Sequence, residues 1–321
     1  MVNNMYENMD KIINCIDEGN YFIVTSHVNP DGDAIGAGLA LLSGIEKFNN
    51  NCEVRFVLQD KTPDRVKFLE LEKRAEIYNE DENYDMDLAI CVDSAALSRI
   101  GDVEKAIKNT FTINIDHHIS NPKYGDINYV ENVSSTSEII YKFLKFLNVE
   151  IDINIGEALY TGLVNDTGNF KHDNVTEETF KMAGYLVKIG VDNSKIVREF
   201  LNTKSMAAIK FLGQAMYEMK FDEKKKLAYF FLSNKDFIKN GGRKEDTEEI
   251  VENLVSYEKA EVSLFLREDK QGVIKGSMRS KYDIDVNSIA GMFGGGGHRK
   301  ASGFTSELSA DEIVRIILEK L

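Results

Sequence analysis

Residues 21–48 have the sequence YFIVTSHVNPDGDAIGAGLALLSGIEKF, and they indicate the fold class more clearly than any other part of the chain. The segment opens with the apolar run 21–27, which is typical of a buried strand. A polar turn, VNPDGD, follows, and residues 34–48 then place their apolar side chains at helical spacing. The segment is therefore expected to be a strand that passes through a short turn into a helix.

The same alternation continues through the first half of the chain. Further strands are predicted at 53–58, 86–94 and 110–118, and helices are predicted at 98–108 and 135–147. Strands that alternate with helices predict a mostly parallel sheet with helices on both faces. The expected fold class is therefore α/β.

The predicted secondary structure changes after a mostly helical stretch at 155–220. Three further strands are predicted there, at 226–234, 260–268 and 272–280. Together with intervening helices, they predict a second, smaller α/β domain with a mixed sheet. We expect a catalytic first domain at 1–190, a helical linker at 191–215 and a substrate-binding second domain at 216–321.

The composition is that of a folded protein of a reducing compartment. Hydrophobic residues make up 43% of the chain and charged residues 29%, which is usual for globular domains. The three cysteines, Cys15, Cys52 and Cys91, are scattered, which argues against a disulfide framework or a zinc finger. No apolar run approaches the roughly 20 residues that span a bilayer, and no signal peptide is recognisable. We expect a soluble cytoplasmic protein.

The net charge of −14 bears on the class of partner. Proteins that follow long nucleic acids usually have a basic surface, because neutralised phosphates drive that binding. An acidic chain can still hold a small anion when bound metal ions supply local positive charge. The excess of carboxylates therefore favours metal ligands and argues against a long nucleic-acid partner.

Polar residues stand at the carboxyl ends of three predicted strands, where parallel sheets bind their ligands. These residues are His27, Asp93 and the run Asp116-His117-His118. The turn after the first strand adds Asp31 and Asp33, which could be aimed at two neighbouring ions or could simply cap the following helix. Asp93 alone could likewise be a turn residue. Asp166, in TGLVNDTGNF, is a further candidate.

The candidates together supply two imidazoles and four carboxylates. They are His27, Asp31, Asp33, Asp93, His117 and Asp166. A mixed set of oxygen and nitrogen ligands suits Mn²⁺ or a similar ion. Two such ions would need a bridging carboxylate, for which Asp93 is best placed, and a pair of ions can stabilise both the attacking and the leaving oxygen of a phosphoryl displacement.

Four segments in this order resemble the successive motifs of the DHH phosphoesterase superfamily. They are HVNPDGDAIGAGLAL (27–41), VDSAALSRIG (92–101), IDHH (115–118) and TGLVNDTGNF (161–170). The segment RSKYDIDVNSIAGMFGGGGHRKASGF (279–304) resembles the glycine-rich motif of the accompanying DHHA1 domain. The chain is most similar to the stand-alone group of bifunctional oligoribonucleases and pAp phosphatases, or nanoRNases, whose relatives cleave pApA or cyclic di-AMP.

The resemblance implies a metal-dependent phosphoesterase that hydrolyses short oligoribonucleotides, pAp or cyclic di-AMP through a hydroxide activated by two Mn²⁺ ions. One ion would be held by His27, Asp31 and Asp93. The other would be held by Asp33, Asp93, His117 and Asp166. His118 would face the substrate phosphate, and Asp116 would orient the site.

The resemblance also implies that the second domain binds a terminal phosphate of the substrate, with the active site in a cleft between the domains. The residues expected to bind it are Arg279, Ser280, Gly294, Gly295, Gly296, Gly297 and His298. Without the resemblance, the glycine run would be interpreted as a flexible loop. A homodimer is expected because dimers are common among such relatives.

Several alternatives stay open on the sequence. An inorganic pyrophosphatase shares the first motifs but lacks GGGGH, and a RecJ-like exonuclease that degrades single strands would usually be longer. A nucleotide sensor with an inactive site is the alternative outside the enzymes. His172 stands where relatives commonly carry an aromatic residue, and Arg99 could form an ion pair or contact phosphate.

Overall fold

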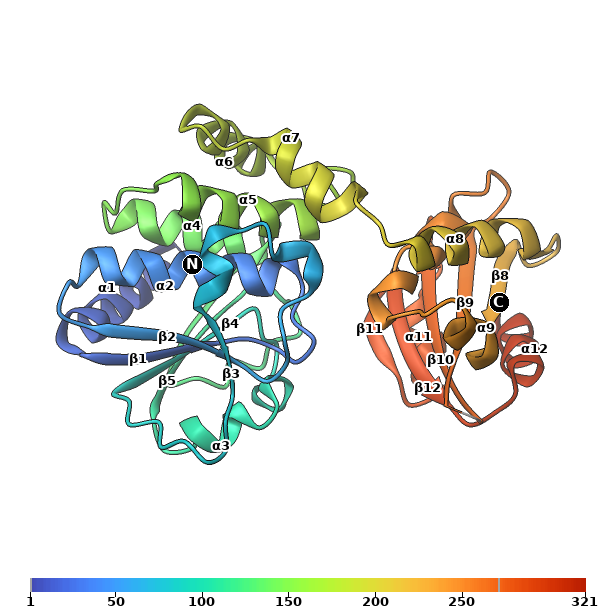
Figure 1. The fold of residues 1–321 in the computed structure, drawn as a ribbon, viewed down its shortest axis with the longest axis horizontal. Helices are drawn as coiled ribbons and strands as arrows, with labels where there is room; N and C mark the ends of the chain where they lie inside the picture. Colours follow the sequence, from blue (N-terminus) through green and yellow to red (C-terminus); the bar gives the residue numbers. More distant parts are fainter. Residues whose placement is uncertain (1, 271) are drawn as a thin grey trace. The chain divides into compact units, whose positions relative to one another are not determined.

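The computed structural model describes residues 2–270 and 272–321. The chain forms two compact units, and the division falls between Thr203 and Lys204 (Figure 1). Each unit is built on its own six-stranded sheet.

The sheet of the first unit is parallel throughout, which confirms the prediction. Its strand order is β3-β2-β1-β4-β5-β6, and every neighbouring pair is parallel. The strands are β1 (Tyr21–Thr25), β2 (Glu53–Leu58), β3 (Ala75–Ile77), β4 (Leu88–Val92), β5 (Phe111–Asp116) and β6 (Ile127–Val130). The central strands β1, β4 and β5 are mainly apolar and buried, because helices cover both faces of the sheet.

Helices lie on both faces of this sheet (Figure 1). The larger core lies between the sheet and α2, α4 and α5, whereas α3 covers a smaller core on the opposite face. The helices of this unit are α1 (Val2–Glu18), α2 (Gly32–Phe48), α3 (Val103–Ile107), α4 (Thr136–Phe146), α5 (Ile153–Asp166), α6 (Glu177–Lys188) and α7 (Asn193–Ile196).

Glycine permits a close approach between α2 and α5. A Cβ atom at Gly36 would collide with the carbonyl oxygen of Ala158, and one at Gly162 would lie 2.5 Å from Oδ1 of Asp33. These contacts show that the two helices run antiparallel, so the last turns of α5 lie beside the first turn of α2. The close packing therefore places Asp33 and Asp166 at the same end of the helix pair.

The order of the strands changes direction between β1 and β4. From β1 the sheet continues to β2 and β3, and from β4 it continues to β5 and β6. Because Thr25 pairs with Cys91, the turns that follow β1 and β4 leave the sheet side by side. Open parallel sheets bind ligands at such a switch point, outside the carboxyl ends of their strands.

The sheet of the second unit is mixed, as predicted. Its order is β11-β12-β10-β9-β8-β7, and only the pair β8–β9 is parallel among the described neighbours. The strands are β7 (Lys220–Asp222), β8 (Leu227–Leu232), β9 (Val262–Lys270), β10 (Val273–Ser280), β11 (Gly296–His298) and β12 (Ala301–Ser306). The helices are α8 (Met206–Glu218), α9 (Asn234–Lys239), α10 (Ile250–Val255), α11 (Val286–Gly291) and α12 (Ala310–Lys320).

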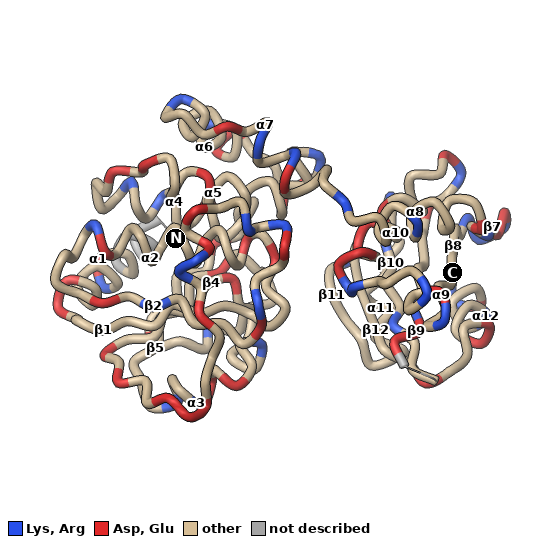
Figure 2. The backbone as a smooth tube through the Cα atoms, in the orientation of Figure 1, with Lys and Arg blue, Asp and Glu red and all other residues tan. Residues whose placement is uncertain are grey.

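The second unit has two cores, one on each face of its sheet. One core gathers side chains from α11 and α12, and the other gathers side chains from α8 and α10. Acidic and basic positions are scattered along the backbone of both units (Figure 2), so the net charge of −14 is distributed rather than confined to one segment. None of the helices in the described residues is long and apolar enough to cross a bilayer.

Candidate metal centre

The residues that follow β1, β4 and β5 meet at one edge of the first sheet. Asp93 and His117 come directly after β4 and β5, and His27 lies two residues after the end of β1. Their side chains contribute to three overlapping groups whose ligand atoms lie within 4.8 Å of one another. The groups are His27–Asp31–Asp93, Asp93–His117–His118 and Asp33–His117–Asp166.

The first group combines the β1 turn with Asp93. Nε2 of His27 lies 3.6 Å from Oδ2 of Asp93 and 3.9 Å from Oδ1 of Asp31. Nδ1 of His27 lies 2.9 Å from the carbonyl oxygen of Val28. A proton on Nδ1 donated to that carbonyl leaves the lone pair of Nε2 directed at the carboxylates, which is the tautomer that can bind a metal ion.

Asp31 has two functions in this turn. Its Oδ1 accepts hydrogen bonds from the N–H groups of Asp33 and Ala34, at 2.9 and 3.1 Å, so it is the N-cap of α2. The same carboxylate lies within reach of His27. The capping interpretation of Asp31 is therefore correct, but it does not exclude a ligand function. Asp33 caps nothing in α2 and is fully buried beside α4 and α5.

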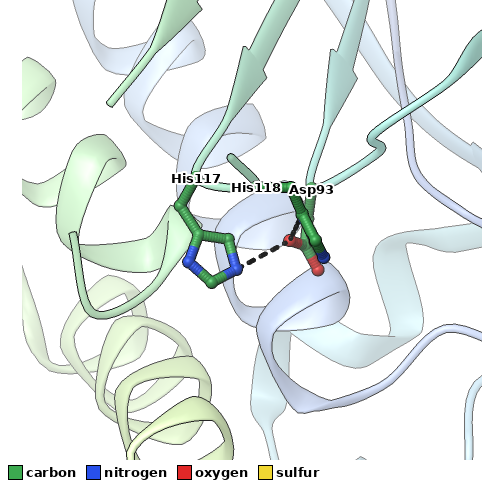
Figure 3. A group of neighbouring side chains, drawn as sticks. All are labelled: Asp93, His117 and His118. Carbon is green, nitrogen blue, oxygen red and sulfur yellow. Dashed lines mark ion pairs between the residues drawn. The ribbon is translucent and has the colours of Figure 1, made fainter. Parts of the chain in front are cut away.

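His117 lies between two carboxylates, those of Asp93 and Asp166. Nε2 of His117 lies 3.0 Å from Oδ2 of Asp166 and 3.7 Å from Oδ1 of Asp93. Its other ring nitrogen, Nδ1, lies 3.2 Å from the carbonyl oxygen of Val133. The imidazole points from the end of β5 toward Asp93 (Figure 3), so this residue joins the end of the sheet to the end of α5.

Asp93 is shared between the groups because its backbone turns sharply after β4. Its φ is +50°, and its N–H donates to the carbonyl oxygen of Ile115 at 3.0 Å. Aspartate and asparagine adopt this left-handed conformation more readily than most residues. Oδ1 of Asp93 then faces His117, while Oδ2 faces His27.

His118 is held by a chain of buried polar groups. Its Nδ1 lies 2.7 Å from Oδ1 of Asp116, and the amide of Asn121 donates to Oδ2 of Asp116 at 2.5 Å. Asn121 also donates to Oδ1 of Asn114 at 2.7 Å. These contacts fix the carboxylate of Asp116 from both sides, and Asp116 in turn fixes the orientation of the imidazole.

The electrostatics of this cluster are dominated by buried carboxylates. Burial and the charges of Asp166 and Asp93 raise the pKa of Asp33 above its usual value. Burial alone would raise the pKa of Asp93 and lower that of the imidazoles, but the attraction between these oppositely charged groups reverses both effects. The nearby imidazole of His27, whose Nε2 lies 3.6 Å from Oδ2 of Asp93, lowers the pKa of Asp93. The carboxylates raise the pKa of His27 to about 9 and that of His117 to about 11.

The donor set fits divalent cations. Asp33 and Asp93 are buried at 0% and 2% exposure, and buried charges must be paired or coordinate metals. Without a metal ion, the raised pKa of His27 and His117 favours protonated imidazoles, whose charge offsets that of these carboxylates. A cation would take over that balance and displace the protons, since a metal ligand must be deprotonated. The acidic and histidine groups of this centre are therefore able to bind metal.

The predicted residues of the second unit are also brought together by strand pairing. In the register of the sheet, Arg279 on β10 and His298 on β11 both pair with Ala301 of β12, from opposite sides. The glycine run that was a candidate flexible loop thus ends in a strand, from Gly296 onward. Arg279 donates from Nε to the carboxylate of Glu252 on α10.

Ser280 and the glycine run 294–297 are the remaining residues of the second unit that were predicted to bind phosphate. The hydroxyl of Ser280 is buried and has no hydrogen-bond partner within the described residues. Gly294 has φ +72° and Gly297 has φ +150°, conformations that favour glycine. A Cβ atom at Gly295 would collide with the backbone around Gly303 and Phe304, so this position also requires glycine.

His172 and Arg99 were left open by the sequence. Nδ1 of His172 lies 3.0 Å from the carbonyl oxygen of Asp166, and its ring packs over Gly168 outside the three ligand groups. The carbonyl oxygen of Arg99 accepts a hydrogen bond of 2.7 Å from the N–H of Val28, next to His27. Both residues therefore border the centre through backbone contacts.

Sequence reasoning missed the residues that hold the candidate ligands in place. Asn121 supports Asp116, and the first residues of α4 donate to Asp33. The pattern Ser135-Thr136-Ser137-Glu138 is a helix-start signal, and Ser135 does cap α4. Nothing in that signal shows that the helix start lies against a carboxylate 103 residues earlier.

Comparisons with known proteins match both units. The family model of the DHH family, N-terminal domain, matches residues 21–163, and that of the DHHA1 domain matches residues 210–321. The bifunctional oligoribonuclease and PAP phosphatase NrnA of Thermus thermophilus is 31% identical over 94% of this chain and 89% of that protein. The protein of the same name from Bacillus subtilis is 30% identical over 92% of each chain.

A solved structure has the same architecture. It is the crystal structure of an exopolyphosphatase-related protein from Bacteroides fragilis, with a TM-score of 0.92 and 28% sequence identity. The match covers 98% of this chain and 96% of that chain.

Proposed function

This chain belongs to the DHH family, and from that premise we propose that it hydrolyses short oligoribonucleotides such as pApA, and also pAp, to mononucleotides. The predicted resemblance to the DHH and DHHA1 domains is confirmed. The chain is a phosphoesterase that acts on small nucleotides. The observation that carries the proposal is the convergence of buried carboxylates and imidazoles at the ends of β1, β4 and β5.

Two divalent cations, with Mn²⁺ as the preferred ion, fit this centre. When bound, such ions would lower the pKa of a water molecule and stabilise charge on phosphate oxygens. His27, Asp31 and Asp93 would hold one of them. Asp33, Asp93, His117 and Asp166 would hold the other. The geometry of Asp93, which directs one oxygen to each group, supports its function as the shared ligand.

His118 would contact the substrate phosphate. When Nδ1–H of His118 donates a hydrogen bond to Asp116, the neutral imidazole carries its lone pair on Nε2. That nitrogen accepts a proton in the neutral form, and the imidazolium donates one to a phosphate or leaving oxygen. Asp116 fixes this tautomer, and Asn121 fixes Asp116.

The second unit would bind a further phosphate of the substrate. Arg279 offers a planar fork of N–H donors that suits phosphate. Glycines 294–297 let the main chain approach an anion closely. Ser280 and His298 would complete this subsite. Such a subsite selects small nucleotides with a terminal phosphate over long nucleic acids.

We further propose a cytoplasmic homodimer. The three cysteines are free, which fits a reducing compartment. Met206, Ile209 and Tyr217 of α8 expose 67%, 54% and 92% of their surface, and exposed apolar residues are common at subunit contacts. Light scattering should give twice the chain mass of 36.3 kDa, and a mass of one chain would contradict the dimer.

Product analysis tests the proposed reaction. Purified protein with Mn²⁺ is incubated with pApA, pAp, a longer oligoribonucleotide, cyclic di-AMP and pyrophosphate. We expect AMP from pApA and pAp, and faster turnover of these than of pyrophosphate. Faster release of phosphate from pyrophosphate would favour the pyrophosphatase alternative. Nucleotide binding without turnover of any substrate would favour the sensor.

A matched pair of substitutions tests the location of the centre. Asp93→Asn keeps a side chain that tolerates φ +50° but removes the shared charge, so we expect activity on pApA to fall by at least about 100-fold. Asp102→Asn makes the same chemical change at an exposed ion pair with Lys105 and should leave activity unchanged. Equal activity of both variants would refute the proposed site.

A further inference from the structure

The first turn of α4 is directed at the candidate metal centre. The N–H of Thr136 donates to Oδ2 of Asp33 at 2.6 Å, and the N–H of Ser137 donates to Oδ1 at 2.9 Å. These are two of the N–H groups that have no partner inside a helix. Ser135 caps the next one, that of Glu138, at 3.1 Å. The carboxylate of Asp33 therefore completes the N-terminal cap of α4 from another part of the chain.

The side chain of Thr136 makes a second contact with the centre. Its hydroxyl donates to Oδ1 of Asp93 at 3.0 Å. Thr136 and Asp33 are buried at 0% exposure and Asp93 at 2%, so water does not compete for these bonds. One residue thus contacts two carboxylates that belong to different ligand groups.

These bonds restrict the rotation of both carboxylates. Both oxygens of Asp33 accept an N–H group, so turning the carboxylate would break two hydrogen bonds in a buried place, where unsatisfied groups are costly. The hydroxyl bond holds Oδ1 of Asp93 on the side of His117, at 3.7 Å from its Nε2. Oδ2 is then left on the side of His27, at 3.6 Å. The orientation of Asp93 needed for sharing is the one that Thr136 maintains.

Close packing of α5 against the start of α4 brings Asp33 and the first turn of α4 together. Gly162 of α5 has no side chain, and a Cβ atom there would collide with Ser137 and would lie 2.5 Å from Oδ1 of Asp33. The glycine therefore lets the start of α4 approach Asp33 closely enough for both N–H groups to bond. The positive end of the α4 dipole also favours the charged form of a carboxylate placed there.

We propose that Thr136 is a positioning residue that orients Asp33 and Asp93 together and so sets the relation between the two cation sites. The inference rests on the proposed metal centre and extends it to a residue outside the candidate ligand set. Its backbone acts on Asp33, and its hydroxyl acts on Asp93. Removing the hydroxyl alone should leave Asp33 in place and release Asp93.

The test compares three variants of the full-length protein. Thr136→Val keeps the shape of the side chain and removes the hydroxyl, whereas Thr136→Ser keeps the hydroxyl. Thr161→Val is the matched control, because Thr161 is equally buried in the same unit but its hydroxyl donates within its own helix to the carbonyl oxygen of Glu157 at 2.8 Å. Titration calorimetry with Mn²⁺ measures affinity without substrate, and electron paramagnetic resonance measures coupling between bound Mn²⁺ ions.

We expect Thr136→Val to bind Mn²⁺ about 10–100-fold more weakly, as for other residues that orient metal ligands, and to lose the coupling signal. Thr136→Ser should keep both the Mn²⁺ affinity and the coupling of the wild type, and Thr161→Val should change only thermal stability. Wild-type Mn²⁺ affinity and coupling in folded Thr136→Val would overturn the proposal, as would equal weakening by Thr161→Val. A wild-type protein that binds Mn²⁺ but cleaves no nucleotide would instead refute the proposed function alone. Failure of the wild type to bind Mn²⁺ would overturn both.

Discussion

The candidate metal centre leaves no room for a Cβ atom at Gly162. Replacing it with alanine would place a methyl group against the hydroxyl of Ser137 and 2.5 Å from Oδ1 of Asp33. We expect Gly162→Ala to destabilise the protein by about 1–3 kcal/mol through overpacking and to weaken Mn²⁺ binding, because Asp33 must move. Thermal unfolding and metal titration of the same sample measure the two effects.

Gly184 provides the control for this substitution. It also lies inside a helix, but a Cβ atom there would meet nothing within 4 Å. Gly184→Ala should therefore raise stability, by up to about 1 kcal/mol, without changing Mn²⁺ affinity. If Gly162→Ala bound Mn²⁺ as tightly as Gly184→Ala, the close approach of α4, α5 and Asp33 would have no importance for the centre.

At the scale of single residues, the sequence predicted side chains at strand ends better than the groups that support them. His27, Asp93 and His117 could be placed together because neighbouring parallel strands end at the same edge of a sheet. The contacts of Thr136 and Asn121 depend on tertiary packing, and neither has a local sequence signal for the carboxylate it holds. The ligand functions themselves stay predictions until metal is bound.

The pairing of α10 with β10 gives a prediction at the scale of elements. Glu252 of α10 forms an ion pair with Arg279 of β10, and their side chains are 50% and 29% exposed. A substrate phosphate would have to displace this carboxylate. Because an exposed ion pair contributes about 0.2–1 kcal/mol, Glu252→Gln should lower the KM for pApA by about 1.5–5-fold.

The control for this prediction removes the same charge from the same region. Glu249 precedes α10 and pairs with Lys204 instead, so Glu249→Gln should lower the KM less. Steady-state kinetics at two salt concentrations separate the local effect from the general one. A higher KM for Glu252→Gln would mean that Glu252 aligns the guanidinium rather than competing with phosphate.

The elements that the sequence predicted are the long apolar ones. β1, β2, β4, β5, β8, β9 and β10 all lie within the predicted strand segments, apart from the last residues of β9, because buried strands have continuous or alternating apolar residues. The edge strands β3, β6, β7 and β11 were not predicted, and neither was β12, whose sequence ASGFTS is mostly small and polar. β11 consists of two glycines and His298, and its strand conformation comes from pairing with β12, which no local pattern in the sequence indicates.

The whole molecule contains separate cores for its two units. Apolar clusters of the first unit draw on residues up to Leu201, and those of the second begin at Ala207. All candidate metal ligands belong to the first unit, whereas Arg279 and the glycine run belong to the second. A ligand that binds only the first unit should therefore stabilise only that unit.

Scanning calorimetry with and without Mn²⁺ tests this separation. At a free Mn²⁺ concentration of 100 times Kd, one site adds about 2.7 kcal/mol to the stability of the unit that binds it. For a unit of about 200 residues this should raise its Tm by about 5–10 °C, while the transition of the second unit keeps its Tm. AMP added without metal should raise the Tm of the second unit and leave that of the first unit unchanged, because the proposed phosphate subsite lies in the second unit. A single transition that shifts as a whole would show that the units unfold together, and a Mn²⁺ shift confined to the second unit would place the metal outside the edge formed by β1, β4 and β5.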